Sequence, residues 1–513
     1  MLSSLIVRLV WTAAALLVSV LLSRKWISHR AFRAAVDKHG CQRPRKHVPN
    51  DLIVNDLAKA RAQAAKDGHA MKPFMDDFER YGKTWEEKDA YGTTIINTMD
   101  KLNIQQVLSL GHQDYSKPDR SMFAPFFGKG IFMEEGAAWK HSRDMIKPIF
   151  SRAELSDMDA FQRHVDRFIK IVPRDGTPVD LQPLLKKLFL DSSTEFIFGE
   201  SMDSQLPGDP NNSAALLRAF DEAFVGAGKR RAAGKLARVK LAFDKSWKVC
   251  LQQVHAFVDR HVERALSISI QEDEESAQAS GQKRHILLHE MAKHIRDPVD
   301  LRFRVLNIFI PALDSIAILV GNVLFHLARN PEAWSQLRKE SARIEGKPLT
   351  YELLRSLKLF RDVVNETIRL QGIVGRAERL AICNTLLPVG GGTDGKAPVF
   401  VEKGTIVGMV IWGLHHDKEI WGEDFAKFNP QRWVDKPSTG VFLPFFAGPR
   451  ICPAQQQVMT QAIYLLVRMS QEFVLIENQD PVTEYVENLK VLAESRNGVQ
   501  VSLISSESTK EIM

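Results

Sequence analysis

Residues 445–454 read Phe-Phe-Ala-Gly-Pro-Arg-Ile-Cys-Pro-Ala. Gly448 permits a tight backbone turn that a side chain would obstruct. Pro453 follows Cys452 directly, and proline is favoured at the first position of a helix. Apolar residues then recur at helical spacing, which predicts a helix over 453–472. Cys452 is therefore expected at a helix N-terminus, where unpaired amides and the helix dipole stabilise a negatively charged sulfur.

A lone cysteine before a core helix is usually a buried free thiol. Here Phe445, Gly448, Arg450 and Cys452 stand at a fixed spacing that is rare by chance. Arg450 can reach an acidic edge of a cofactor, while the turn keeps the sulfur from free oxidation. We interpret the loop as one that holds the Cys452 thiolate against a haem iron.

The bulk composition is that of a globular protein, with 44% apolar and 26% charged residues among 513. The chain is long enough for one large domain or several ordinary ones. Its four cysteines lack the spacing of a metal finger, and a disulfide framework is not expected, as in a reducing compartment. They are Cys41, Cys250, Cys383 and Cys452.

The N-terminus predicts a membrane anchor. Leu5–Leu22 is apolar except for Arg8, which lies near one end and can extend toward the membrane surface. Its length is about the minimum for a spanning helix. A cleaved signal peptide is the alternative, but the stretch lacks a basic start, and Ser23-Arg24-Lys25 is a poor cleavage site. We therefore predict an uncleaved anchor over 1–23.

The basic charge of the chain is concentrated just after this anchor. Residues 24–46 carry eight Lys or Arg and one Asp, which accounts for the whole formal charge of +7. The positive side should face the cytosol. The rest of the chain is balanced, which argues against nucleic-acid binding. Two prolines within 41–50 predict a stiff linker, so 24–50 is assigned as a basic, Pro-containing linker.

Residues 51–513 are predicted to form one domain, mainly α with small β-sheets (an α+β fold). A polar stretch at 270–284 predicts a surface loop, and Gly390–Gly395 predicts a hairpin turn, because it does not open a helix as a dinucleotide loop would. Helices are predicted at 140–149, 155–172, 180–198, 212–226, 236–268, 284–293, 298–329, 331–344, 350–370 and 453–472. Strands are predicted at 378–388, 398–402, 406–411, 471–476 and 499–504.

A second motif is a set of charges. Glu366 and Arg369 lie three residues apart, on one face of a helix whose apolar residues indicate burial. A buried charge needs a partner, and Arg432 is a candidate third member. The Glu-x-x-Arg pattern alone is common, but its place before the cysteine loop favours a structural charge triad.

Together these motifs resemble the cytochrome P450 family of haem-thiolate monooxygenases. The resemblance covers about residues 45–503 and is strongest to fungal microsomal members that hydroxylate alkanes and fatty acids. It includes Gly128-Lys129-Gly130-Ile131-Phe132, Trp139-Lys140-His141-Ser142-Arg143, Leu387-Pro388-Val389-Gly390-Gly391-Gly392 and the cysteine loop. It implies a cytochrome P450 fold, with an N-terminal transmembrane helix and haem b as cofactor.

The resemblance also implies roles for single residues. Cys452 would be the axial ligand of the iron, held in the loop that Phe445 begins. Four cationic or hydrogen-bonding side chains would meet the haem propionates, namely Trp139, Arg143, Arg379 and Arg450. Glu366, Arg369 and Arg432 would form the structural charge triad.

The apolar helix predicted around residues 305–328 departs from the family pattern. Family members carry Ala-Gly, any residue, an acid and Thr, whereas this chain has Pro311-Ala312-Leu313-Asp314-Ser315. Asp314 and Ser315 retain an acid and an alcohol, which we interpret as a proton relay for oxygen activation. The alternative is a local helix bend with the hydroxyl bonded back to a carbonyl. Pro311 predicts a kink.

A second departure lies at 371–375, Gln-Gly-Ile-Val-Gly, where relatives often carry Tyr-Pro and a second proline. This segment helps to wall the substrate cavity in the family. The cavity is therefore expected to differ from that of a plain alkane hydroxylase.

The leading prediction is a monooxygenase of the endoplasmic reticulum membrane, single-pass, with a cytosolic catalytic domain and an apolar lipid or secondary-metabolite substrate. Its partners would be membrane lipid and NADPH–cytochrome P450 reductase, with cytochrome b5 as an optional second donor. Four basic residues are candidates for docking the reductase: Lys140, Arg143, Lys147 and Arg152. Two alternatives remain, a reductase-independent isomerase or dehydratase and a non-enzymatic membrane-tethered binding protein.

Overall fold

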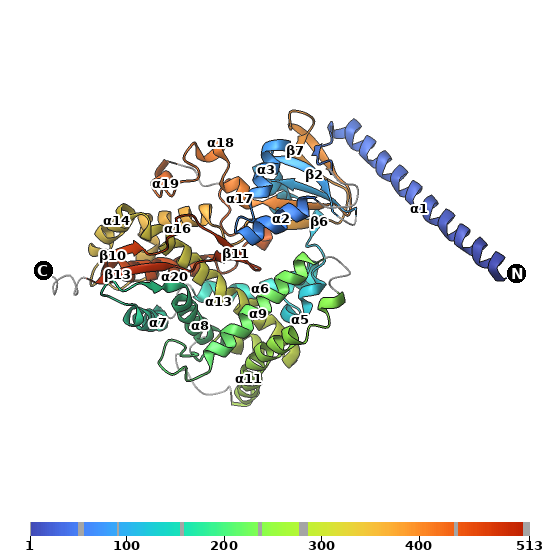
Figure 1. The fold of residues 1–513 in the computed structure, drawn as a ribbon. Coiled ribbons are helices and arrows are strands. Elements are labelled where there is room, and N and C mark those ends of the chain that lie inside the picture. Colours follow the sequence, from blue (N-terminus) through green and yellow to red (C-terminus); the bar gives the residue numbers. More distant parts are fainter. Residues whose placement is uncertain are drawn as a thin grey trace.

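The structure is a computed structural model that describes residues 2–49, 56–89, 92–153, 158–233, 239–275, 286–435 and 440–505. A helical body forms one side of the molecule, and a sheet-rich part lies beside it, next to the base of a projecting N-terminal helix (Figure 1). The predicted fold class, mainly α with small sheets, is confirmed.

The longer helices build the body. They are α6 Gly136–Ala153, α7 Met158–Ile171, α8 Leu181–Phe198, α9 Ser213–Ala232, α11 Lys245–Glu275, α13 Pro298–Ala328, α14 Pro331–Ala342, α16 Lys358–Leu370 and α20 Gln455–Glu472. Shorter helices connect them or cover the sheet. They are α2 Asp56–Asp67, α3 Lys72–Tyr81, α4 Lys101–Gln105, α5 Ala124–Phe127, α12 Leu287–Ala292, α15 Tyr351–Ser356, α17 Ile411–His415, α18 Lys418–Trp421 and α19 Arg432–Asp435.

The largest sheet has the strand order β1-β2-β3-β9-β6-β4. Its strands are β1 Arg45–Lys46, β2 Thr84–Lys88, β3 Thr94–Thr98, β4 Tyr115–Ser116, β6 Arg376–Ala381 and β9 Ile406–Val410. There are three smaller sheets among the described residues. One has the order β10 (Phe473–Asn478), β13 (Gln500–Ser505) and β5 (Val179–Asp180). The other two are pairs, β11 (Glu487–Leu489) with β12 (Ala493–Ser495) and β7 (Thr385–Gly391) with β8 (Ala397–Val401). The β7–β8 pair is antiparallel across Gly390–Gly395, so the predicted hairpin turn is confirmed.

Helix α13 is the central element of the core. Its Val320 and Leu324 belong to one buried apolar cluster, and its Phe309 and Leu313 belong to a second. The helix is long and apolar enough to cross a membrane, but 83% of its most apolar window is buried inside the protein. A helix that is apolar all round is stable when other elements surround it. It is therefore a core helix, and the acidic Asp314 near its middle would be costly inside a bilayer.

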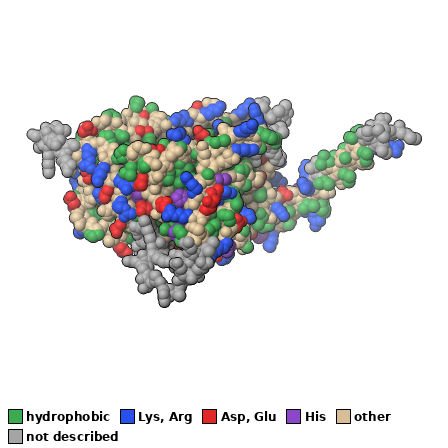
Figure 2. Space-filling view, turned by 90° about the horizontal axis from the view of Figure 1, so that it is seen from below, with side chains coloured by type: hydrophobic (Ala, Val, Ile, Leu, Met, Phe, Trp, Pro, Cys, Tyr) green, Lys and Arg blue, Asp and Glu red, His purple; other side chains and the backbone are tan. Residues whose placement is uncertain are grey.

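Helix α1 (Leu2–His39) extends away from the body, and Figure 2 shows hydrophobic side chains along it. The stretch Arg8–His39 contains an 18-residue window that is apolar and long enough to span a membrane, and none of that window is buried. The helix continues to His39, so the first part of the segment predicted as a linker, 24–50, is helical instead. Ser28 donates a 2.6 Å hydrogen bond to Glu402, beside β8, so the end of α1 rests on the β7–β8 hairpin.

Most predicted elements are present, but several boundaries differ from the prediction. The helix predicted over 350–370 breaks at Leu357, which separates α15 from α16. The strand predicted over 378–388 is two strands, β6 and β7, in different sheets. The loop predicted at 270–284 is helical to Glu275, and 276–285 lies outside the described residues.

The sequence reading missed the first hairpin of the large sheet. Strand β2 contains Glu86, Glu87 and Lys88, so its apolar alternation is hidden. Glu87 is nevertheless buried, because Arg61 and Asn97 bind its carboxylate at 3.0 and 2.7 Å. Such a partner is what permits a charge inside a sheet.

Candidate active site around Cys452

The cysteine loop is held by close backbone contacts. Gly448 begins a short 3-10 turn with φ +71°, and a Cβ there would lie 1.9 Å from the Leu108 carbonyl oxygen. Only glycine satisfies both conditions. The Cys452 N–H donates to the Phe445 carbonyl at 3.1 Å and closes the loop. Helix α20 begins at Gln455 rather than at the predicted residue 453, so Cys452 precedes its first turn.

The surroundings of the Cys452 sulfur act on its pKa in opposite directions. Burial raises the pKa of the thiol, whereas a hydrogen bond from the Ala454 N–H and the positive charge of Arg143 lower it. Burial is the strongest of these effects, so the thiol is the favoured form of the protein alone. A metal ion that binds this sulfur must displace its proton, while the Ala454 amide and Arg143 stabilise the thiolate that results.

Helix α6 brings two predicted residues to this loop. The Arg450 guanidinium lies 4.3 Å from the centre of the Trp139 ring, a cation–π contact. Arg143, one turn further along the same helix, is half-buried and faces the Cys452 sulfur closely enough to affect its titration. Trp139, Arg143, Arg450 and Cys452 thus converge from α6 and the cysteine loop.

Two cations that the sequence reading missed complete the site. Lys117 lies near Arg450, Arg120 and Arg379, and burial together with their positive charges lowers its pKa to about 6. Burial and the charge of Arg450 likewise lower the pKa of Arg379 to about 10. Neither Lys117 nor Arg120 belongs to a recognisable motif, so only the fold reveals that they join the group.

Positive charge predominates in this part of the site. Glu135 forms an ion pair with Arg450 at 2.5 Å, and Glu378 near Arg120 is itself paired with Arg376. Crowded, buried cations are costly unless an anion joins them. The two propionates of a haem would supply that anion, and Cys452 would supply the thiolate. The residues present therefore fit the implied cofactor.

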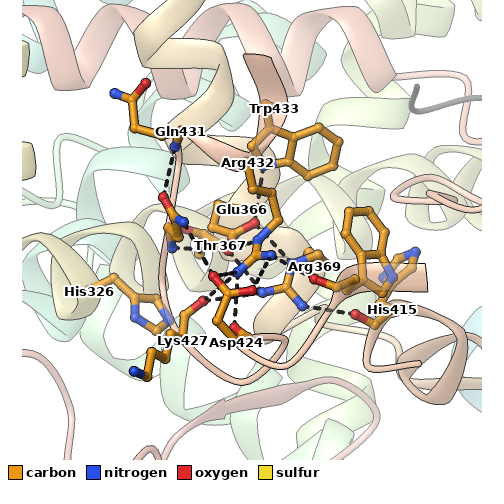
Figure 3. Close-up of polar contacts among 12 residues, drawn as sticks. His326, Glu366, Thr367, Arg369, His415, Asp424, Lys427, Gln431, Arg432 and Trp433 are labelled. Carbon is orange, nitrogen blue, oxygen red and sulfur yellow. Dashed lines mark hydrogen bonds and ion pairs between the residues drawn. The ribbon is translucent and has the colours of Figure 1, made fainter. Parts of the chain in front are cut away.

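The predicted charge triad is present and fully buried (Figure 3). Arg369 binds both oxygens of Glu366 at 2.9 Å, and Arg432 binds one of them at 2.9 Å. The Trp433 indole also donates to Glu366, at 3.1 Å. Because Glu366 and Arg369 are 0% exposed, the carboxylate is satisfied entirely by protein donors.

The triad is connected to the cysteine loop through His415. Arg369 donates to the His415 carbonyl at 2.9 Å, and the His415 Nε2 accepts from the Leu443 N–H at 2.9 Å. Phe446 N–H in turn donates to the Leu443 carbonyl at 3.2 Å. Burial lowers the pKa of His415 to about 3, and the charges of His416 and Arg369 add to that effect. The ring is therefore neutral and free to accept at Nε2.

Helix α13 places the two predicted relay residues in different surroundings. The Ser315 hydroxyl donates to the Pro311 carbonyl at 2.5 Å, which is the back-bonded arrangement that sequence analysis considered as an alternative. The Asp314 carboxylate faces Lys186 of α8, with 3.8 Å between Oδ1 and Nζ. Helix α13 continues through Pro311 without interruption.

Asp314 belongs to a cluster of charges that joins four elements. Lys186 lies 2.9 Å from Glu494 of β12 and 3.5 Å from Asp221 of α9, while Lys490 binds both of these acids at 2.8 and 3.0 Å. Burial raises the pKa of Asp314 to about 6, although the charge of Lys186 opposes the rise. A carboxyl group with this pKa can take up and release a proton near neutral pH.

Replacing Glu366 tests the triad. Glu366→Gln removes the charge between two buried arginines, so we expect a loss of about 3–5 kcal/mol in the free energy of unfolding. Urea unfolding of the purified protein measures it. Glu352→Gln, the same change at an exposed position of α15, should alter the value by less than about 0.5 kcal/mol. Equal effects of the two substitutions would contradict the role assigned to the triad.

Replacing Asp314 tests its raised pKa. The folded protein binds this proton more tightly than the unfolded chain does, so ionisation of Asp314 destabilises the fold as pH rises from about 4 to about 6. Asp314→Asn should match the original protein near pH 4 and exceed it by about 3 kcal/mol above pH 6. Unfolding curves across this pH range measure the difference. Parallel pH profiles of the two proteins would show that Asp314 titrates normally.

Comparison with known proteins agrees with this geometry. The cytochrome P450 family model matches residues 60–501. Cytochrome P450 monooxygenase himC of Aspergillus japonicus is 34% identical over 95% of this chain and 88% of its own. Cytochrome P450 52A12 of Debaryomyces hansenii is 32% identical over 91% and 92%, and cytochrome P450 52A10 of Candida maltosa is 36% identical over 76% and 77%. The chain belongs to the cytochrome P450 family of monooxygenases.

Proposed function

We propose that this enzyme is a haem-thiolate monooxygenase in which Cys452 is the axial ligand of haem b. One observation carries the proposal. Cys452, which has a backbone donor and the charge of Arg143 near its sulfur, lies in the same loop as Arg450, and Arg450 belongs to a half-buried excess of cations. Trp139, Arg143, Arg379 and Arg450, joined by Lys117 and Arg120, would hold the two propionates. Haem bound through a thiolate supplies the electron density that promotes cleavage of the O–O bond.

The reaction would insert one oxygen atom of O2 into a C–H bond of an apolar lipid or secondary-metabolite substrate. The second oxygen atom leaves as water. Its formation takes up two protons, together with two electrons that NADPH provides through a separate reductase. Lys140 is exposed and remains a candidate for docking that reductase, as does Lys147 on the same helix. Arg143 is not a good candidate, because it faces Cys452. The side chain of Arg152 lies outside the described residues.

The two protons would pass through Asp314 and Ser315. Asp314 has a pKa that suits proton transfer near neutral pH, and it touches a cluster that reaches the half-exposed carboxylate of Asp221. Ser315 would have to rotate away from the Pro311 carbonyl before it could donate to another acceptor. In this structure the Ser315 hydroxyl is therefore not yet oriented for proton transfer.

Helix α1 would anchor the enzyme in the endoplasmic reticulum membrane, with the catalytic domain in the cytosol. The helix spans 38 residues, about 57 Å at the usual rise, whereas a bilayer core is about 30 Å thick. Its basic second half would emerge on the cytosolic side. An apolar substrate dissolved in that membrane would then have a short path to the catalytic domain.

Replacing Cys452 tests the assignment of the ligand. Cys452→Ala should lose the carbon monoxide difference spectrum of thiolate-ligated haem and all NADPH-dependent turnover with a reductase. Cys383→Ala, at the exposed cysteine, should keep both. A retained thiolate spectrum in Cys452→Ala would refute the assignment. Turnover of a peroxide by the original protein without NADPH or reductase would instead support the isomerase or dehydratase alternative.

Replacing Lys117 tests the propionate site. Lys117→Met keeps the length of the side chain but removes the amine, which a bound propionate would keep protonated, so haem should dissociate about tenfold faster. Transfer of haem to excess apomyoglobin measures the rate. Lys140→Met, on the exposed face of α6, serves as the matched control and should dissociate at the original rate. If Lys117→Met also kept the original rate, Lys117 would not face the cofactor.

A further inference from the structure

The loop Phe127–Phe132 lies flat against the distal helix α13. Gly128 has φ +55°, and a Cβ there would lie 2.0 Å from the Phe303 ring. Gly130 has φ +141°, and a Cβ there would lie 2.6 Å from the side chain of Asn307. Both glycines are therefore required by their conformation and by the close approach of the loop to the helix.

Asn307 binds this loop with every polar atom of its side chain. It is 1% exposed. Its Oδ1 accepts from the Phe132 N–H at 3.0 Å. Its Nδ2 lies within donor distance of the Phe127 carbonyl at 2.7 Å, of the Lys129 carbonyl at 3.1 Å and, one turn earlier in α13, of the Phe303 carbonyl at 2.8 Å. An amide offers a donor and an acceptor on one short side chain, so it satisfies loop groups of both kinds.

The same stretch of loop holds the cations of the proposed cofactor site. The Ile131 and Phe132 carbonyls each accept from Lys117 Nζ at 2.8 Å. Arg120 donates to the Phe132 carbonyl at 3.3 Å. Phe132 thus bonds to Asn307 through its N–H and to Lys117 and Arg120 through its carbonyl.

We propose that Asn307 is a positioning residue for the propionate site. It fixes the loop Phe127–Phe132 on the distal helix, and the loop fixes Lys117 and Arg120 in the orientation that binds the propionates. Asn307 acts through these two cations and does not itself touch the cofactor. The inference rests on the proposed function, because it requires haem at Cys452 with its propionates toward Lys117.

The test uses the full-length, haem-loaded protein and two variants. Asn307→Ala removes the donor and the acceptor, whereas Asn307→Asp fits the same space, keeps the acceptor and replaces the donor with a carboxyl oxygen that the Phe127 and Lys129 carbonyls repel. Both should lose haem to apomyoglobin about tenfold faster than the original protein. If Asn307→Ala fails to fold, Asn307→Asp alone decides. A rate equal to that of the original protein in the folded variants overturns the proposal.

A buried asparagine on the same helix provides a matched control. Asn322 is 2% exposed, accepts from the Tyr485 hydroxyl at 2.9 Å and lies four turns further along α13. Asn322→Ala should lower the thermal midpoint while leaving the rate of haem loss unchanged. Equal acceleration by Asn322→Ala and Asn307→Ala would show that general destabilisation is the cause, and would overturn the proposal.

Combining Asn307→Ala with Lys117→Met separates an effect through Lys117 from an independent one. If Asn307 acts through the cations, the double variant should lose haem at little more than the rate of Lys117→Met alone. Multiplication of the two separate accelerations would contradict the proposal. The proposed function fails in a different way: the original protein would then show no thiolate-ligated haem spectrum, whatever residue stands at 307.

Discussion

The cysteine loop depends on the ion pairs that the buried carboxylate of Glu366 forms with Arg369 and Arg432. The carboxylate neutralises these two arginines, which come from segments about 60 residues apart, in a place that water does not reach. Arg369 also donates to the carbonyl of His415, whose ring accepts from the Leu443 N–H just before the cysteine loop. A buried ion group of this kind contributes less to net stability than to the choice of one arrangement, because any alternative leaves a charge unpaired.

The site itself is organised by an imbalance of charge. Lys117, Arg120, Arg379 and Arg450 approach one another in a poorly solvated region, and burial lowers the pKa of each of them. Such a group is stable only when an anion completes it. The cofactor that the family implies carries that anion at one edge and an iron that needs a thiolate at its centre. The cations that such an anion would complete and the cysteine that could supply the thiolate thus lie in one part of the fold.

The distal helix shows how this chain departs from the family pattern. Pro311 removes one backbone donor, and the Ser315 hydroxyl bonds to the Pro311 carbonyl one turn later. The Asp314 carboxylate lies near the Lys186 ammonium group. Lys186 in turn pairs with Glu494 on the β11–β12 hairpin and with Asp221 on α9. The acid is thereby linked to elements that are distant in sequence, and its proton affinity is set by them.

The sequence by itself determined the class of the fold, the anchor-like apolar helix, the charge triad and the cysteine loop. Each of these can be recognised from local spacing: a 3.6-residue apolar period, a Glu-x-x-Arg pair on one helix face, or a glycine four residues before a cysteine. The tertiary structure alone decided which cations surround the site and how β2 could hold a buried Glu87. It also decided that Asn307 bonds a loop some 180 residues earlier. These depend on contacts between distant segments, and no periodicity records them, because burial and partner choice are properties of the packed chain.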